Sequence, residues 1–129
     1  MVYTDIIKRN KDFQLCFRKG RSFVSRFVIV YARPNKLPCN RLGITTGKKI
    51  GGAVVRSRAR RLIRQAWRET ELLAPVGLDI VIVARTGLAD CKSTELRHYF
   101  EKYAIPLLHR IYAGENPMPR PPRPGGKPA

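Results

Sequence analysis

Residues 48–69 read KKIGGAVVRSRARRLIRQAWRE and carry eight lysines and arginines before the first carboxylate, that of Glu69. The apolar side chains of this stretch recur at helical spacing, which predicts a helix over residues 53–73. At 100° per residue they fall within an arc of roughly 140°, and they are Val55, Ala59, Leu62, Ile63, Ala66 and Trp67. A row of arginines four residues apart runs beside this arc: Arg56, Arg60, Arg64 and Arg68. The stretch therefore predicts an amphipathic helix with one face in the core and the other cationic.

The segments that flank this helix predict the strands of one sheet. Residues 26–34 (RFVIVYARP) are rich in β-branched and aromatic side chains, and residues 41–47 (RLGITTG) follow after the turn NKLPCN, so we expect the two to form a hairpin. Residues 78–85 (LDIVIVAR) form the most continuous apolar run, which predicts a central strand buried on both faces. A helix between two strands predicts a βαβ unit.

Two further helices complete the predicted fold. A short helix over residues 13–19 follows Asp12 as its cap and ends at Gly20. A last helix begins near Ser93 and contains Pro106, which should kink or split it. The predicted class is α+β, a mixed sheet packed with helices in the order α-β-β-α-β-α. We expect residues 1–113 to form a single domain and residues 114–129, which have almost nothing to bury, to form a flexible tail.

The charge distribution indicates a polyanionic partner. Lysine and arginine number 26 against nine aspartates and glutamates, for a net charge of +17. No acidic residue occurs from Phe13 to Arg68, yet fifteen of the cations lie there. Such cations repel one another along a helix, and only an anionic ligand removes that cost. Because the arginine fork pairs bidentately with phosphate, we expect a structured RNA as the partner, and no DNA.

The sequence offers no catalytic constellation. Two-metal phosphodiester cleavage needs clustered carboxylates, and the nine acids are scattered. His98 and His109 would lie roughly 16 Å apart on one straight helix, too far to act together on one phosphate. TGKKIGG, residues 46–52, lacks the spacing of a nucleotide-binding loop, although the helix start that follows suits a phosphate of a polymer. We therefore expect no catalytic residue and no metal site in this chain.

The cysteines and the hydropathy bear on where the protein works. Cys16, Cys39 and Cys91 are widely and unequally spaced, which is typical of reduced thiols. No apolar run approaches the roughly 18 residues that cross a bilayer, and the first residues lack the order of a signal peptide. We expect a cytoplasmic protein with no membrane partner.

Three aromatic side chains leave two interpretations open. Phe13 and Phe17 are one helical turn apart, and Tyr31 lies on the adjacent predicted strand. All three fit a core, which is the usual location of such residues. They also fit a platform on which single-stranded nucleotides stack, because Arg18, Lys19, Arg21 and Arg26 flank them.

The stretch RLGITTGKKIGGAVVRSRARRLIRQAWRE, residues 41–69, closely resembles the signature of the bacterial ribonuclease P protein subunit. The signature has a glycine after the strand start, a Lys-Lys pair, Gly-x-Ala-Val and then Arg-Asn-Arg with further cations. The matching residues are Gly43, Lys48, Lys49, Gly51, Ala53, Val54, Arg56, Arg58, Arg61 and Arg64. KRNKDFQLCFRKGRS, residues 8–22, is similar to the family's first helix, and LDIVIVAR to its last strand. Ser57 stands where the family pattern has asparagine.

The resemblance implies a fold and a function. The βαβ unit built from residues 41–47, 53–73 and 78–85 would have the unusual left-handed crossover of the family. The holoenzyme would remove the 5′ leader of precursor tRNA, with the hydrolysis performed by a catalytic RNA subunit and Mg²⁺ held mainly by the RNA partners.

The family's contacts map onto two groups of residues in this chain. The implied leader-binding residues are Phe13, Phe17 and Tyr31. The implied residues for binding the RNA subunit are Lys48, Lys49, Arg56, Ser57, Arg58, Arg60, Arg61, Arg64 and Arg68. The charge alone also suits a structural RNA-binding protein such as a ribosomal protein, and a self-sufficient nuclease is a second, weaker alternative because the carboxylates are scattered.

Overall fold

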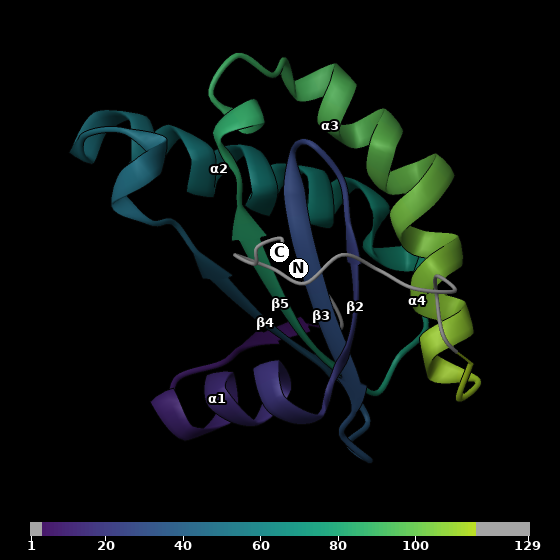
Figure 1. Ribbon diagram of the computed structural model, residues 1–129. Coiled ribbons are helices and arrows are strands. Elements are labelled where there is room, and N and C mark those ends of the chain that lie inside the picture. Colours follow the sequence, from purple (N-terminus) through teal and green to yellow (C-terminus); the bar gives the residue numbers. More distant parts are fainter. Residues whose placement is uncertain (1–3, 116–129) are drawn as a thin grey trace.

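The computed structural model describes residues 4–115 (Figure 1). Their helices and strands are β1 (Thr4–Ile6), α1 (Asn10–Lys19), β2 (Arg21–Val24), β3 (Val28–Pro34), β4 (Asn40–Thr45), α2 (Ala53–Thr70), β5 (Leu78–Ala84), α3 (Ser93–Tyr99) and α4 (Ile105–Tyr112). Short 3₁₀ turns occupy Lys48–Ile50, Glu71–Leu73 and Thr86–Leu88, and a π-helical segment, Phe100–Ala104, joins α3 to α4. The predicted tail lies outside the described residues beyond Glu115.

The strands form one mixed sheet in the order β1-β4-β5-β3-β2. β4 runs parallel to both β1 and β5, while β3 runs antiparallel to both β5 and β2. Every residue of β5 except Val83 is buried. The predicted α+β class, the mixed sheet and the central position of LDIVIVAR are confirmed.

The predicted strand order is wrong in two respects. It lacks β1 and β2, which are only three and four residues long and bury few side chains. The predicted hairpin is also wrong, because β5 lies between β3 and β4 and the hairpin partner of β3 is β2. A strand that is apolar on both faces gains most from the middle of the sheet, so β5 separates two strands that are neighbours in the sequence.

The βαβ unit is confirmed, since α2 connects the adjacent parallel strands β4 and β5. The helix and the 3₁₀ turn after it together cover the predicted range 53–73. Val55 departs from the predicted buried face and is 37% exposed, because the N-terminal end of α2 projects beyond the sheet (Figure 1). The left-handed crossover stays a prediction from the resemblance.

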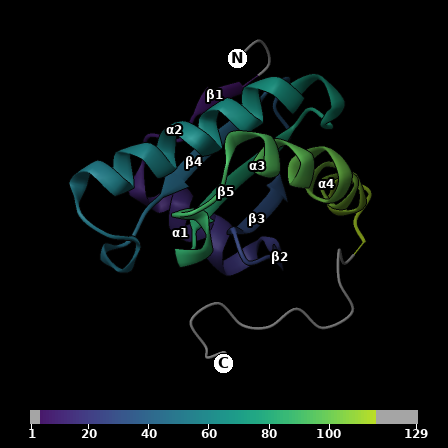
Figure 2. The same ribbon diagram turned by 90° about the horizontal axis from the view of Figure 1, so that it is seen from above.

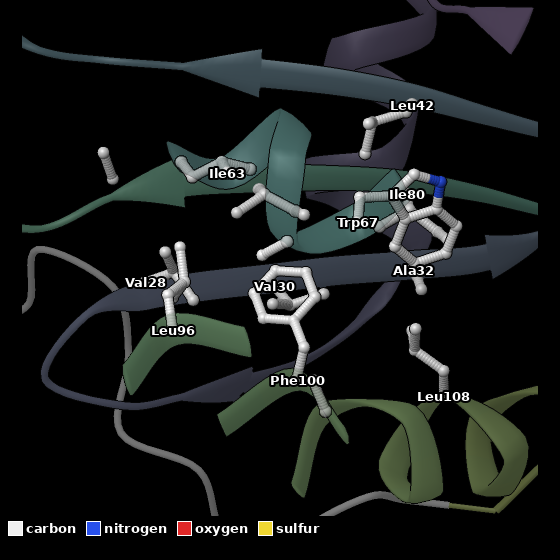
Figure 3. Close-up of a cluster of buried hydrophobic side chains, with 14 of the residues drawn as sticks. Val28, Val30, Ala32, Leu42, Ile63, Trp67, Ile80, Leu96, Phe100 and Leu108 are labelled. Atoms are coloured by element: carbon white, nitrogen blue, oxygen red, sulfur yellow. The ribbon is translucent and has the colours of Figure 1, made fainter. Parts of the chain in front are cut away.

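Two hydrophobic layers enclose the sheet. α2, α3 and α4 cover one face, where Trp67, Ile63 and Phe100 pack against alternate residues of β3 and β5 (Figures 2 and 3). α1 covers part of the other face with a smaller cluster around Cys16, Tyr31 and other buried side chains. Full burial of one large apolar side chain contributes about 1.5–3 kcal/mol, so the layer containing the completely buried Trp67 stabilises the fold most.

The last helical segment shows how the chain accommodates Pro106. The π-helical segment ends directly before α4, and Pro106 lies in the first turn of α4, where a missing N–H costs little. A π-helical segment thus divides the predicted last helix into α3 and α4, while the chain stays helical from Ser93 to Tyr112. The wider turn also changes which side chains face the sheet, because Tyr103 is 58% exposed while Ala104 and Ile105 are buried.

α1 begins earlier than predicted. It starts at Asn10 with Arg9 at the N-cap, so Asp12 lies in the first helical turn and is not the cap. Gly20 is needed for close approach and not for a left-handed backbone, because its φ is −75° and a Cβ there would lie 2.4 Å from the carbonyl oxygen of Cys16.

A buried ion pair fixes α1 to the sheet. The carboxylate of Asp79 in β5 accepts hydrogen bonds from Arg41 Nε at 2.8 Å, Arg41 Nη2 at 2.6 Å and Asn35 Nδ2 at 2.9 Å. Arg41 Nη1 also lies 3.5 Å from Asp12 Oδ2 of α1. Burial alone would raise the pKa of Asp79, but the hydrogen bonds from Arg41 and Asn35 outweigh it and hold that pKa below its usual value.

Replacing Arg41 tests this network. Arg41→Met leaves the Asp79 carboxylate buried without its cation, so we expect a loss of about 3 kcal/mol in the free energy of unfolding at neutral pH. Arg97→Met is the control, because it removes an exposed ion pair in which Arg97 Nε lies 3.9 Å from Glu69 Oε1. This substitution should change the free energy of unfolding by less than about 0.5 kcal/mol. Urea unfolding monitored by circular dichroism measures both variants.

The pH dependence gives a second test of the same pair. Because the folded pKa of Asp79 is lowered, its contribution is complete above the unfolded value near 4 and disappears as the pH falls through the folded value. The unfolding free energies of the wild type and Arg41→Met should therefore converge in acid. A difference that stays constant from neutral pH into acid would contradict the assignment.

Candidate RNA interface

One surface of the molecule gathers exposed cations. Lys48 and Lys49 are exposed on the 3₁₀ turn before α2. Arg61, Arg64 and Arg68 are exposed along α2, where they line a shallow hollow together with Gln65 and Glu69. These five cations are free to meet phosphate groups.

The start of α2 supports the same chemistry through its backbone. Gly51 has a φ of +143°, in the region that favours glycine, and it ends the 3₁₀ turn. Gly52 is the N-cap of α2, and no side chain caps the first turn, which also contains no acidic residue. The unpaired N–H groups of a helix start carry partial positive charge, which adds to that of the two lysines.

Arg58 has a structural role that the sequence did not reveal. Its Nη1 donates to the carbonyl oxygen of Ala89 at 3.1 Å, and its Nη2 donates to that of Cys91 at 3.0 Å. The half-buried guanidinium therefore holds the segment between β5 and α3 against α2. Two of the five N–H donors of this guanidinium are thus used within the protein.

Arg60 is oriented by two hydroxyl groups. Its Nη1 donates to Thr46 Oγ1 and its Nη2 to Ser57 Oγ, both at 3.0 Å. Ser57, which replaces the asparagine of the family pattern, thus supplies an acceptor within the same helix. Arg56 is half-buried, and its Nε is a buried donor with no hydrogen-bond partner in residues 4–115.

The aromatic residues meet on the opposite face of the sheet. The rings of Phe17 and Tyr31 make an edge-to-face contact with centroids 4.9 Å apart. Tyr31 is only 8% exposed, and burial raises the pKa of its hydroxyl. Phe13 and Phe17 are half-buried, and the ring of Phe13 lies over Gly43, where a Cβ would come within 2.4 Å. Tyr31 thus belongs mainly to the core, whereas the two phenylalanines also present ring surface to solvent.

Histidine, cysteine and carboxylate side chains are the groups from which a metal site could be built. His98 and His109 are both exposed. Burial raises the pKa of the Cys16 thiol to about 12, and the three cysteines are free. Within residues 4–115 no group of three histidine, cysteine, aspartate or glutamate side chains could hold a metal ion. The donor set therefore does not fit a Mg²⁺ site built from this part of the chain alone.

Hydropathy adds one finding on membranes. Among the described helices, none combines the length and the apolar character that a bilayer crossing requires.

A basic crossover helix on one side of a mixed sheet, with an aromatic surface on the other, defines a small α+β RNA-binding protein. The profile of the family described as Ribonuclease P matches residues 1–110. The chain belongs to this family of ribonuclease P proteins.

Individual relatives and solved structures support the same family assignment. The chain is 36% identical over 114 residues to the ribonuclease P protein component of Lachnoclostridium phytofermentans, covering 88% of this chain and 97% of that protein. It is 46% identical over 83 residues to that of Brevibacillus brevis, covering 64% and 66%. The RNase P proteins of Staphylococcus aureus and Thermotoga maritima both superpose with a TM-score of 0.71, at 30% and 29% identity, covering 83% of this chain and 96% and 97% of theirs. The ribosomal protein alternative is not favoured.

Sequence reasoning missed the residues that support the cations. Thr46 accepts a hydrogen bond from Arg60, but no sequence pattern indicates this contact. Ala89 and Cys91 hold Arg58 through their backbone carbonyls, which every residue has and which side-chain type therefore does not reveal. One signal was present: Asp79 is a lone carboxylate within an apolar strand, and a buried carboxylate requires a cation.

A matched pair of variants separates structural from ligand-facing arginines. Arg58→Ala should lower the free energy of unfolding by about 2 kcal/mol, because two hydrogen bonds from a charged donor are lost. Arg61→Ala, at an exposed position three residues further on, should change it by less than about 0.5 kcal/mol and instead lower the salt dependence of RNA binding by about one unit of log-log slope. Thermal unfolding and filter binding across salt concentrations provide the two readouts. Equal destabilisation of the two variants would contradict the structural role of the hydrogen bonds from Arg58 to Ala89 and Cys91.

Proposed function

We propose that this chain is the protein subunit of ribonuclease P and acts with a catalytic RNA subunit to remove the 5′ leader from precursor tRNA. The observation that carries the proposal is the family match over residues 1–110, which includes the cationic helix and its flanking glycines. The absence of acids from Phe13 to Arg68 supports a role in binding RNA. In this proposal the protein raises the affinity for the RNA partners and orients them, while the RNA subunit performs the hydrolysis.

The RNA subunit is proposed to contact the surface made by Lys48, Lys49 and the arginines of α2. The exposed Arg61, Arg64 and Arg68 offer planar forks for phosphate oxygens. The half-buried guanidinium of Arg56 adds positive charge beside them. Arg58 and Arg60 mainly hold the loops that frame this surface.

The leader is proposed to lie against the face of the sheet that carries Phe13, Phe17 and Tyr31. α1 covers only part of this face, and the half-buried Val24 and Val83 line the remainder. Stacking of a base on an aromatic ring contributes about 1–3 kcal/mol and tolerates any sequence. Such tolerance suits leaders that differ from one precursor to the next.

Magnesium is proposed to be held by the RNA partners, and when bound there it supplies the chemistry of phosphodiester hydrolysis. The two buried carboxylates of the described residues are engaged within the protein: Asp79 accepts from Arg41, and Glu71 accepts a hydrogen bond from Thr4. Its lysines and arginines would lower the repulsion between RNA backbones that must approach one another. A cytoplasmic location is proposed because the widely spaced cysteines are typical of a protein whose thiols stay reduced.

Reconstitution tests the function directly. Precursor tRNA incubated with the purified, RNA-free protein should stay intact, the RNA subunit alone at low magnesium should cleave it slowly, and the two together should cleave it rapidly at the mature 5′ end. Gel analysis of end-labelled precursor gives the rates. Cleavage by the protein alone would overturn the proposal, and so would the lack of any effect of protein on the RNA subunit.

Phe17→Ala tests the leader surface. We expect holoenzyme affinity for precursor with a long leader to fall about 5- to 150-fold, which corresponds to the loss of one base stack, while affinity for mature tRNA stays unchanged. Tyr112→Ala is the control, since Tyr112 is an exposed aromatic on α4 that takes no part in this surface. Equal losses for precursor and mature tRNA would reject the leader surface.

A further inference from the structure

A hollow of about 150 Å³ lies at the β1 edge of the sheet, between α1 and α2. We call it the edge hollow. Its lining includes Ile6 at the end of β1, Phe13 of α1, Ile44 of β4, and Arg60 and Arg64 of α2. It joins an aromatic ring, apolar side chains and two cations, and no acidic residue lines it.

The backbone of β4 opens into this region. β1 pairs with β4 only as far as Leu42, whose carbonyl accepts from the N–H of Ile7 at 3.0 Å, whereas on its other side β4 stays paired with β5 up to Thr45. Alternate residues of a parallel strand direct their N–H and C=O to the same edge, so the next outward pair belongs to Ile44. Within residues 4–115 no strand faces that pair, which leaves one donor and one acceptor at the sheet edge.

The charged rim is partly preorganised. Arg60 is held by Thr46 and Ser57, while Arg64 is exposed and has no hydrogen-bond or ion-pair partner in the described chain. Phe13 is fixed over Gly43, so its ring has little freedom to lose on binding a ligand. A fixed ring beside an exposed, unpartnered cation suits a ligand with a flat apolar part and an anionic part.

We propose that the edge hollow receives one unpaired nucleobase of the precursor leader. The base lies between Phe13 and Ile6, its polar edge meets the backbone of Ile44, and the adjoining phosphate meets Arg64. The volume equals that of about five water molecules, which suits one ring system and leaves the phosphate outside. The inference rests on the proposed function, since Phe13 also belongs to the leader surface.

The leader is favoured as the source because of continuity along the sheet. A strand that stacks on Phe17 and Phe13 reaches the hollow at its next step, as Phe13 contributes to both. An extended peptide could also pair with the free edge of β4, but two arginines and no acid at the hollow favour a polyanion. The leader then crosses from the α1 face to the cations of α2 around this edge of the sheet.

Ile6→Glu tests the site, because Ile6 is 54% exposed and its replacement places a carboxylate at the hollow without removing Phe13 or Arg64. Ile6→Trp fills the hollow without changing charge. Leu72→Glu is the control, with the same chemical change at a residue that is 74% exposed outside the hollow. Unfolding curves establish that all three variants fold.

The measurement is holoenzyme affinity for precursor tRNA over a series of leader lengths, with affinity for the RNA subunit measured separately. Both Ile6 variants should lose about 5- to 50-fold for long leaders only, with RNA-subunit affinity equal to that of Leu72→Glu. 4-Thiouridine placed singly along the leader should crosslink to residues 4–9 or 42–46 from one leader position in the wild type, and Ile6→Trp should abolish that crosslink.

Each other outcome overturns the proposal in a distinguishable way. Loss of RNA-subunit affinity in the Ile6 variants would assign the hollow to the RNA subunit. Wild-type leader dependence in both variants, with Phe17→Ala still defective, would reject the hollow and keep the leader surface. Wild-type leader dependence in Phe17→Ala as well would reject the leader surface itself.

Discussion

The structure depends on the balance between burial and charge repulsion along α2. Each pair of like charges four residues apart destabilises an isolated helix by about 0.2–0.5 kcal/mol, and the arginine row contains three such pairs. The opposite face buries Trp67 and Ile63 completely, and each contributes about 1.5–3 kcal/mol. Burial on one face therefore outweighs the charge repulsion on the other, and a polyanion bound along the arginine row would remove that repulsion.

The sequence was most informative where one element has a strong pattern of its own. The periodicity of α2 and the apolar run of β5 predicted both elements correctly, together with the buried central position of β5. The pairing of β3 with β5, and the short strands β1 and β2, depend on contacts between residues far apart in the chain, which no local pattern encodes. Tyr103 shared the helical spacing of its neighbours, and only the π-helical segment turns it outward.

The candidate site was predicted less completely than the fold. Residue type identified the cations and the aromatic rings, and the structure gathers them on the two faces of the sheet. It could not separate Arg58, which straps a loop to α2, from Arg61, which faces solvent, because the two side chains are chemically identical. That difference arises from carbonyl groups contributed by a segment about thirty residues away. Which arginines of the cluster support the fold and which face solvent is therefore decided by the tertiary structure.

The short β1 has a further consequence for the protein when it is not bound to RNA. An unpaired strand edge is a template on which a second copy of a chain can add a strand, and this is a common route to aggregation. Here the open part of β4 lies beside Arg60 and Arg64, and two copies meeting along it would bring their cations together. Neutralising these arginines would therefore remove a repulsion that opposes such pairing of free copies.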